Sequence, residues 1–139
     1  MMALEDPALA SAIVEAALLL DASLALYTLA GSATHHAANK QGMRVVPEFF
    51  ADRGYHRDGR VKMFDWRIEE AGGTPIAIAE RVVRLVQHGL VESFEGDTVT
   101  VTAKTVCVHS DTPDAPAIAA AIRQALQDAG IAIDPPLTA

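Results

Sequence analysis

The chain has 139 residues, of which half are hydrophobic, and a formal net charge of −7 at pH 7. This length suits one domain with a real core, and this hydrophobic content excludes a disordered chain. The negative charge argues against a nucleic-acid partner, and the single cysteine excludes an internal disulfide. The longest apolar stretch, from Ala8 to Leu20, is too short to span a bilayer, and the first residues lack the basic start of a signal peptide. We therefore expect a single cytoplasmic domain over residues 1–139, with no membrane partner.

The first fifty residues predict two helices that alternate with two strands. Asp6-Pro7 is an acidic cap followed by proline, which is typical of a helix start. The apolar positions of this helix that we expect to cover a sheet are Leu9, Ile13, Ala16 and Leu20. A short strand is expected at Leu24–Leu29. It is followed by a helix that Ser32 caps and Gly42 ends, and then by a second strand at Arg44–Phe50.

The middle of the chain contains a long polar segment, from Asp52 to Gly73, with aromatic residues embedded in it. A loop of this length inside a domain is usually functional or disordered. An ordered active-site lid and a surface excursion anchored by Trp66 are both compatible with the pattern. A helix is expected from Thr74 to Gly89, and the alternation from Val91 to Thr102 around Glu95-Gly96 predicts a hairpin.

A polar turn between a strand and a helix is the most informative stretch of the sequence. The run from Thr105 to Val108 is apolar and β-branched, as in a buried strand, and it ends abruptly in His109-Ser110-Asp111-Thr112. Pro113 opens the last long helix, which either Asp111 or Thr112 can cap. Strands that alternate with helices predict an α/β fold with parallel strands and right-handed crossovers, to which the late hairpin is added.

Candidate site residues follow from the rule that α/β proteins place their chemistry at the carboxyl ends of parallel strands. His109 is suited to general acid–base catalysis because a histidine side chain ordinarily titrates near neutrality. The alternative is a strand-end histidine that hydrogen-bonds a neighbouring loop. Asp111 could orient His109 or activate water, and it could also cap the final helix. Ser32 follows the first strand and is a candidate for substrate binding.

A second group of candidates lies at the end of the strand at Arg44–Phe50. Glu48 and Asp52 are acidic groups at one strand end, where mutual repulsion could raise a pKa. Arg53 is suited to a bidentate grip on a substrate carboxylate. An internal pair of Arg53 with Asp52 or Glu48, which would fix the loop, is also compatible with the sequence. Tyr55 is a further candidate for substrate binding, with simple packing as its alternative.

Two stretches resemble signatures of the LamB/YcsF family: Phe-Ala-Asp-Arg-Gly-Tyr at residues 50–55, and Thr-Val-Cys-Val-His-Ser-Asp-Thr-Pro at residues 105–113. Further features that fit the family are Gly31-Ser32, the Asp58-Gly59-Arg60 turn, the helix through Glu80 that ends at His88-Gly89, and the Ala-rich final helix. The resemblance extends from about Asp6 to Ile131.

Members of this family are the A components of the ATP-dependent 5-oxoprolinase of prokaryotes. The resemblance therefore implies hydrolysis of the 5-oxoproline lactam to glutamate, with subunits B and C as partners, on an incomplete (β/α) barrel similar to that of polysaccharide deacetylases. The residues that we expect to be catalytic are His109, Asp111, Glu48 and Asp52, and those that we expect to bind substrate are Arg53, Ser32 and Tyr55. No Gly-rich phosphate loop with a following Lys-Ser or Lys-Thr is present, so ATP is expected to bind to the partner subunits. No Cys/His cluster has zinc-site spacing, and we predict no metal site.

The resemblance covers only the C-terminal half of the family pattern. The acidic first strand, the Gly/His loop and the Lys-Pro-His-Gly segment of the other half do not occur in this sequence. We expect a half barrel, and a gene model begun at an internal methionine, a split gene and a relic all fit that expectation. An open sheet edge near Leu24–Leu29 predicts association with a second copy or with an N-terminal half. Two other functions are compatible with the sequence: a non-catalytic binding or assembly module, and a metal-dependent hydrolase similar to the deacetylases.

Overall fold

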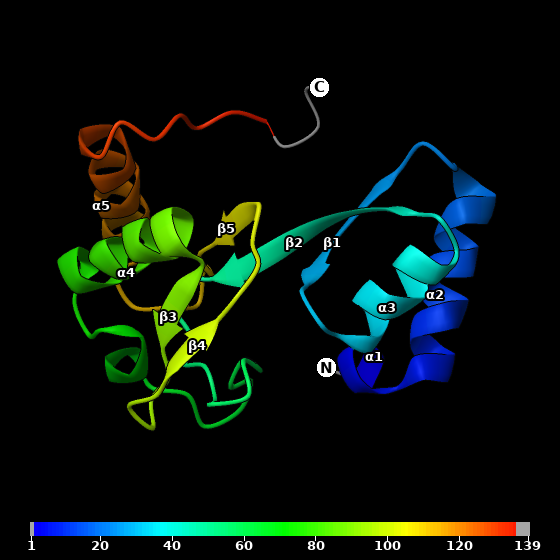
Figure 1. Ribbon diagram of the computed structural model, residues 1–139, viewed down its shortest axis with the longest axis horizontal. Coiled ribbons are helices and arrows are strands. Elements are labelled where there is room, and N and C mark those ends of the chain that lie inside the picture. Colours follow the sequence, from blue (N-terminus) through cyan, green and yellow to red (C-terminus); the bar gives the residue numbers. More distant parts are fainter. Residues whose placement is uncertain (1, 136–139) are drawn as a thin grey trace. The chain divides into compact units, whose positions relative to one another are not determined.

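The computed structural model describes residues 2–135, in which helices and strands alternate along the chain (Figure 1). The elements are α1 (Met2–Glu5), α2 (Pro7–Leu20), β1 (Ala25–Leu29), α3 (Ala33–Lys40), β2 (Arg44–Phe50), the 3-10 helix η1 (Ile68–Ala71), α4 (Pro75–His88), β3 (Leu90–Glu92), β4 (Thr98–Thr100), β5 (Thr105–Cys107) and α5 (Ala115–Asp128). The α/β class with parallel strands and a late antiparallel pair is confirmed. Within the described residues, no helix is both long and apolar enough to cross a membrane.

The chain divides into two compact units. The first unit comprises the described residues up to Glu48 together with residues 102–105. The second unit comprises residues 49–101 and the described residues from Val106 onward.

The first unit is built on the parallel pair β1–β2. Their register runs from Ala25 opposite Arg44 to Leu29 opposite Glu48. Helices α2 and α3 pack against each other, and α3 also packs against β1. The core of this unit is centred on Val14, Ala38 and Met43.

Helix α2 buries a different face from the one predicted. Its start is as expected, because Asp6 Oδ1 accepts hydrogen bonds from two backbone N–H groups of the first turn. The buried positions, however, are Ala10 and Val14, whereas Ile13 and Leu20 are 39% and 81% exposed. The prediction was wrong because this helix is apolar nearly all round, with a single charged residue, so its periodicity does not single out a face.

Strand β5 completes a three-stranded sheet in the order β1-β2-β5. Lys104 N donates to Pro47 O at 2.8 Å, and Ala51 N donates to Cys107 O at 3.0 Å. The bonded positions advance in the same direction along both strands, so β5 runs parallel to β2. Such an arrangement brings the carboxyl ends of the two strands to the same edge of the sheet.

The second unit has a core between α4 and α5, which lie side by side (Figure 1). Helix α4 begins and ends as predicted. Thr74 Oγ1 accepts from Ala77 N at 3.2 Å, and Gly89 ends the helix in the left-handed region at φ 69°. The side chains that α4 and α5 bury are Ile78, Ala79, Val82, Leu85, Ile118, Ile122 and Leu126.

The predicted hairpin is confirmed as the antiparallel pair β3–β4. Val91 lies opposite Val99, and the turn is closed by a hydrogen bond from Ser93 N to Asp97 O at 2.7 Å. Gly96 occupies the turn at φ 90°, a conformation that favours glycine.

Helix α5 begins later than the sequence predicts. Its first residue is Ala115, and Asp114 stands at the N-cap in the left-handed region without a side-chain capping bond. Neither Asp111 nor Thr112 caps the helix, so the cap predicted from the residues before Pro113 is wrong. Both side chains instead bond to residues that follow β2.

Candidate active site

The site is centred on the carboxylate of Asp52, which lies just beyond the end of β2 and is 0% exposed. Its Oδ2 accepts from the backbone N–H of His109 at 3.0 Å and from Arg53 Nη1 at 2.9 Å. Its Oδ1 is 2.9 Å from His109 Nδ1. The hydroxyl of Thr112 also donates to Oδ2. A buried carboxylate therefore has donors on both oxygens, from both sides of the β5–α5 turn.

These donors determine the charge state of Asp52. Burial raises the pKa of the Asp52 carboxyl, but the hydrogen bonds from Thr112 and His109 outweigh burial and hold that pKa below its ordinary value. Asp52 is therefore ionised at neutral pH. The prediction that repulsion between Glu48 and Asp52 raises a pKa is wrong for Asp52, because hydrogen bonds from Thr112 and His109 lower its pKa.

His109 follows β5 and its ring is oriented by Asp52. An ionised carboxylate only accepts hydrogen bonds, so Nδ1 carries the proton that is shared with Asp52 Oδ1. In the neutral ring, Nε2 then holds a lone pair, and the side chain is 28% exposed. The ring also contacts Phe50 edge to face, with centroids 4.5 Å apart. The sequence suggests Asp111 for the orienting role, and the structure gives that role to Asp52 instead.

Arg53 is buried and takes part in the same network. Its Nη1 donates to Asp52 Oδ2 and, at 2.8 Å, to Thr112 Oγ1, while Nη2 donates to Asp111 Oδ1 at 3.2 Å. The internal Asp52–Arg53 pair, which the sequence leaves as one of two alternatives, is present. It fixes the polar loop that follows β2.

Trp66 covers one face of Arg53. The centre of its ring system lies 3.6 Å from the guanidinium carbon, which is a close cation–π contact. The residue before it, Asp65, has φ 49°, a backbone conformation that costs energy for a residue other than glycine. The long segment that contains Trp66 is thus ordered, and its aromatic anchor rests on the site rather than on a remote surface.

Arg81 is a residue that the sequence analysis missed. It reaches from α4 to the loop after β2, where Nη1 donates to the carbonyl oxygens of Ala51 and Arg53, each at 3.1 Å. These two carbonyls flank Asp52. Burial lowers the pKa of Arg81 to about 10, which leaves the guanidinium charged at neutral pH. No pattern in the sequence marks this residue, because only the packing of α4 against the loop gives it a role.

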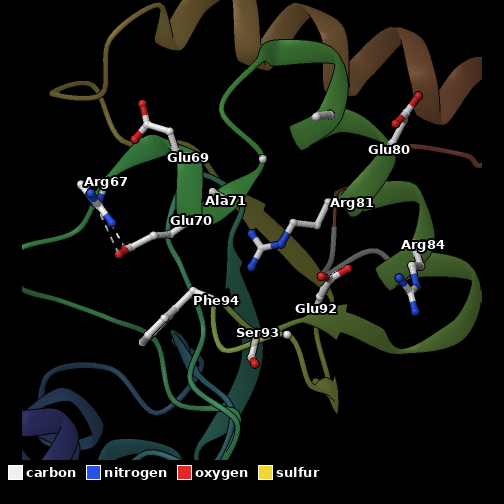
Figure 2. A pocket seen from close by; sticks show the side chains of 13 residues that line it. Arg67, Glu69, Glu70, Ala71, Glu80, Arg81, Arg84, Glu92, Ser93 and Phe94 are labelled. Carbon is white, nitrogen blue, oxygen red and sulfur yellow. Dashed lines mark hydrogen bonds and ion pairs between the residues drawn. The ribbon is translucent and has the colours of Figure 1, made fainter.

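The same arginine borders a cavity of about 670 Å³ in the second unit. Figure 2 shows Arg81 in the middle of the labelled side chains, with Ala71 on one side and Glu92 on the other. Its Nη2 is buried and has no hydrogen-bond partner among the described residues. The charged residues that line the cavity are Arg67, Glu69, Glu70, Glu80, Arg81, Arg84 and Glu92.

The remaining predicted site residues are Ser32, Glu48 and Tyr55. Ser32 and Glu48 belong to the first unit, where Ser32 caps α3 through His35 N and Glu48 lies opposite Leu29. Tyr55 belongs to the second unit and packs in the core, 2% exposed and stacked on Phe49. Its hydroxyl accepts a hydrogen bond from a backbone N–H. Within residues 2–135, no three His, Cys, Asp or Glu side chains are grouped closely enough to hold a metal ion.

The fold and the site together define a class: an α/β protein that holds a buried, ionised aspartate against a partly exposed histidine where parallel strands end. Comparison of the sequence with models of protein families identifies the family within this class. The chain belongs to the LamB/YcsF family, whose model matches residues 1–139, as the two sequence signatures predicted.

Similar proteins carry names that agree with this family. The chain is 42% identical over 130 residues to the A component of the 5-oxoprolinase of Mycobacterium avium (strain 104), covering 91% of this chain and 50% of that protein. It is 43% identical over 132 residues to the corresponding 5-oxoprolinase component of Bordetella pertussis, covering 95% and 52%. A crystal structure of the lactam utilization protein from Thermus thermophilus matches with a TM-score of 0.84 and 36% identity, over 95% of this chain and 52% of that one. The chain thus spans about half the length of the relatives it matches.

Proposed function

We propose that this chain forms the C-terminal half of an A-type 5-oxoprolinase component and carries the general base for hydrolysis of the 5-oxoproline lactam. The observation that supports the proposal is the pair of Asp52 and His109, in which an ionised carboxylate binds Nδ1 and leaves a lone pair on Nε2. The names of the relatives supply the substrate class.

In the proposed reaction, His109 Nε2 takes a proton from water as the water oxygen bonds to the lactam carbonyl carbon. Asp52 stabilises the resulting imidazolium, because the two groups are hydrogen-bonded in a buried place. The carbon–nitrogen bond then breaks and the leaving nitrogen takes up a proton, which His109 is placed to return. The products are the open-chain amine and a carboxylate, which in 5-oxoproline are those of glutamate.

The remaining roles belong to the same proposal. ATP, bound to partner subunits B and C, would supply a phosphoryl group to the lactam oxygen, which makes the amide carbon a better electrophile, and this group would leave as inorganic phosphate when the product carboxylate forms. Arg53 is proposed to bind the substrate carboxylate. The cytoplasmic location and the participation of Ser32, Glu48 and Tyr55 in the reaction stay predictions, and so does pairing with an N-terminal half.

Complementation tests the proposal. The chain is co-expressed with a matching N-terminal half and with subunits B and C, and release of glutamate from 5-oxoproline is assayed. We expect His109→Gln and Asp52→Asn each to lower kcat by about 10²-fold or more, which is the usual contribution of a general base. His88→Gln, which changes an exposed histidine at the end of α4, is the matched control and should leave the rate unchanged.

Two outcomes would contradict the proposal. If the restored complex works equally well with His109→Gln, the base lies elsewhere. If the assembled complex contains the chain but releases no glutamate with any variant, the alternative of a non-catalytic assembly module is favoured.

A further inference from the structure

Arg53 and Asp111 form an ion pair whose two members differ in burial. Nη2 of Arg53 lies 3.2 Å from Asp111 Oδ1, and the side chains are 6% and 73% exposed, respectively. An ion pair with one partner in solvent contributes about 0–1 kcal/mol, so the carboxylate of Asp111 is held weakly. The guanidinium of Arg53, by contrast, is held from several directions.

The other contacts of Arg53 fix its guanidinium in place. Nη1 is hydrogen-bonded to Asp52 and Thr112, and one face of the group lies against Trp66. Among the described residues, the buried side-chain nitrogen that lacks a partner belongs to Arg81, so Arg53 has no such orphan. The contact between Nη2 and Asp111 is thus the contact of Arg53 whose partner lies mostly in solvent.

We propose that the Nη2 side of Arg53 is a binding subsite for the carboxylate of a small ligand, and that the carboxylate of Asp111 occupies this subsite until the ligand displaces it. The observation that carries the proposal is an exposed carboxylate, bound through one oxygen, on a buried and otherwise immobilised guanidinium. An incoming carboxylate has the same charge and geometry as Asp111 and can use two oxygens. Displaced Asp111 returns to water at little cost, because it is mostly hydrated already.

The ligand class is a small monocarboxylate. The charges of Asp52 and Arg53 cancel, so the subsite attracts a distant anion only weakly. It therefore recognises its ligand by direct hydrogen bonds from Arg53. That the ligand is 5-oxoproline rests on the proposed function, whereas the exchange of carboxylates at Arg53 does not. The role that this gives to Asp111 is opposite to a catalytic one: its removal improves binding.

Fluorescence of Trp66 provides a direct test, because it is the single tryptophan of the chain and contacts Arg53. The 139-residue chain is titrated with 5-oxoproline, with acetate and with 2-pyrrolidinone, which is the same lactam without a carboxylate. We expect Asp111→Asn to bind both carboxylates about two- to fivefold more tightly than the parent chain, as loss of a competitor worth up to about 1 kcal/mol requires. 2-Pyrrolidinone should bind neither form measurably.

Asp114→Asn is the matched control, because it removes an equal charge from an exposed residue of the same turn that makes no side-chain capping bond. Its affinities should equal those of the parent chain. An equal gain in affinity in both variants would show that the loss of one negative charge explains the tighter binding, and this would overturn the proposal. Arg53→Lys should lose the response to carboxylates. Circular dichroism establishes that this variant is folded, and the comparison of Asp111→Asn with the parent chain does not depend on it.

The outcomes separate this inference from the proposed function. Weaker or unchanged carboxylate binding by Asp111→Asn overturns the exchange, and so does the absence of any response to carboxylates in both forms. If Asp111→Asn binds both carboxylates more tightly but 5-oxoproline no better than acetate, the exchange stands and the assignment of 5-oxoproline as the ligand fails.

Discussion

Replacing Arg81 by methionine should destabilise the loop that carries Asp52. It changes none of the side chains that bond to His109. Methionine keeps the length of the apolar stem but removes the guanidinium, which donates to the carbonyl oxygens of Ala51 and Arg53. A hydrogen bond from a charged donor contributes about 1.5–3 kcal/mol. The loss is offset in part because burial of the guanidinium, with one unpartnered nitrogen, is itself costly. We therefore expect Arg81→Met to lower the free energy of unfolding by about 2–5 kcal/mol.

Denaturation in urea, followed by Trp66 fluorescence, measures this change, because Trp66 lies in the same compact unit as Arg81. Arg84→Met is the matched control: Arg84 lies on the same helix and lines the same cavity (Figure 2), but it is exposed and forms no ion pair within the described part of the chain. It should change the free energy of unfolding by less than about 0.5 kcal/mol.

A second readout connects Arg81 to the histidine. In the parent chain, nitrogen NMR of His109 should show the neutral ring protonated at Nδ1, the form that the hydrogen bond to Asp52 selects. In Arg81→Met, the loop that carries Asp52 loses its anchor, and we expect a mixture of the two neutral forms. Equal stability of the two methionine variants, together with an unchanged His109 spectrum, would refute the reasoning.

Two further predictions concern the carboxylate of Asp52 and can be measured on the isolated chain. The pKa of Asp52 is lowered by folding, so its contribution to stability is complete above the unfolded value of about 3.9 and is lost as the pH falls through the lower folded value. Asp52→Asn should therefore be less stable than the parent at neutral pH but lose less stability on acidification; an equally steep acid loss in urea titrations at a series of pH values would contradict this. Thr112→Val removes the hydroxyl that donates to Asp52 and accepts from Arg53, at a cost of about 1–3 kcal/mol, whereas Thr112→Ser keeps it and should stay within about 1 kcal/mol of the parent. Calorimetric unfolding compares the two, and equal losses would show that the methyl group rather than the hydroxyl matters.

Those parts of the fold that depend on local chemistry could be predicted from the sequence. Helix α4 carries its own start and stop in Thr74 and Gly89, and the hairpin carries its turn glycine in Gly96. The buried face of α2 and the first residue of α5 could not be predicted in the same way. In α2, apolar residues occur on every side of the helix. Before α5, the expected cap residue Thr112 instead donates its hydroxyl to the carboxylate of Asp52, which is distant in the sequence.

In the candidate site, too, some features could be predicted from the sequence and others depend on tertiary packing. The rule that chemistry lies at strand ends placed Asp52, Arg53 and His109 in one region, and the structure brings these three together. Which carboxylate bonds to His109 depends on tertiary packing, and for this reason the sequence suggests Asp111 for the orienting role that Asp52 has in the structure. Arg81 donates to two main-chain carbonyls. Every residue has such a carbonyl, so the sequence does not indicate which ones an arginine will bond.

The separation along the chain of the groups around Asp52 has a consequence for folding. The bonds from His109 and Thr112 to Asp52 join residues 57 and 60 positions apart. Closing so large a loop costs entropy before any contact compensates for it, and contacts of such large sequence separation are typical of slowly folding chains. During synthesis, Asp52 emerges from the ribosome well before its donors do, and until the β5–α5 turn follows it is an ordinary solvated carboxylate next to an arginine. A chain that is stalled or cleaved before residue 109 therefore contains Asp52 but lacks the histidine that we propose as the base.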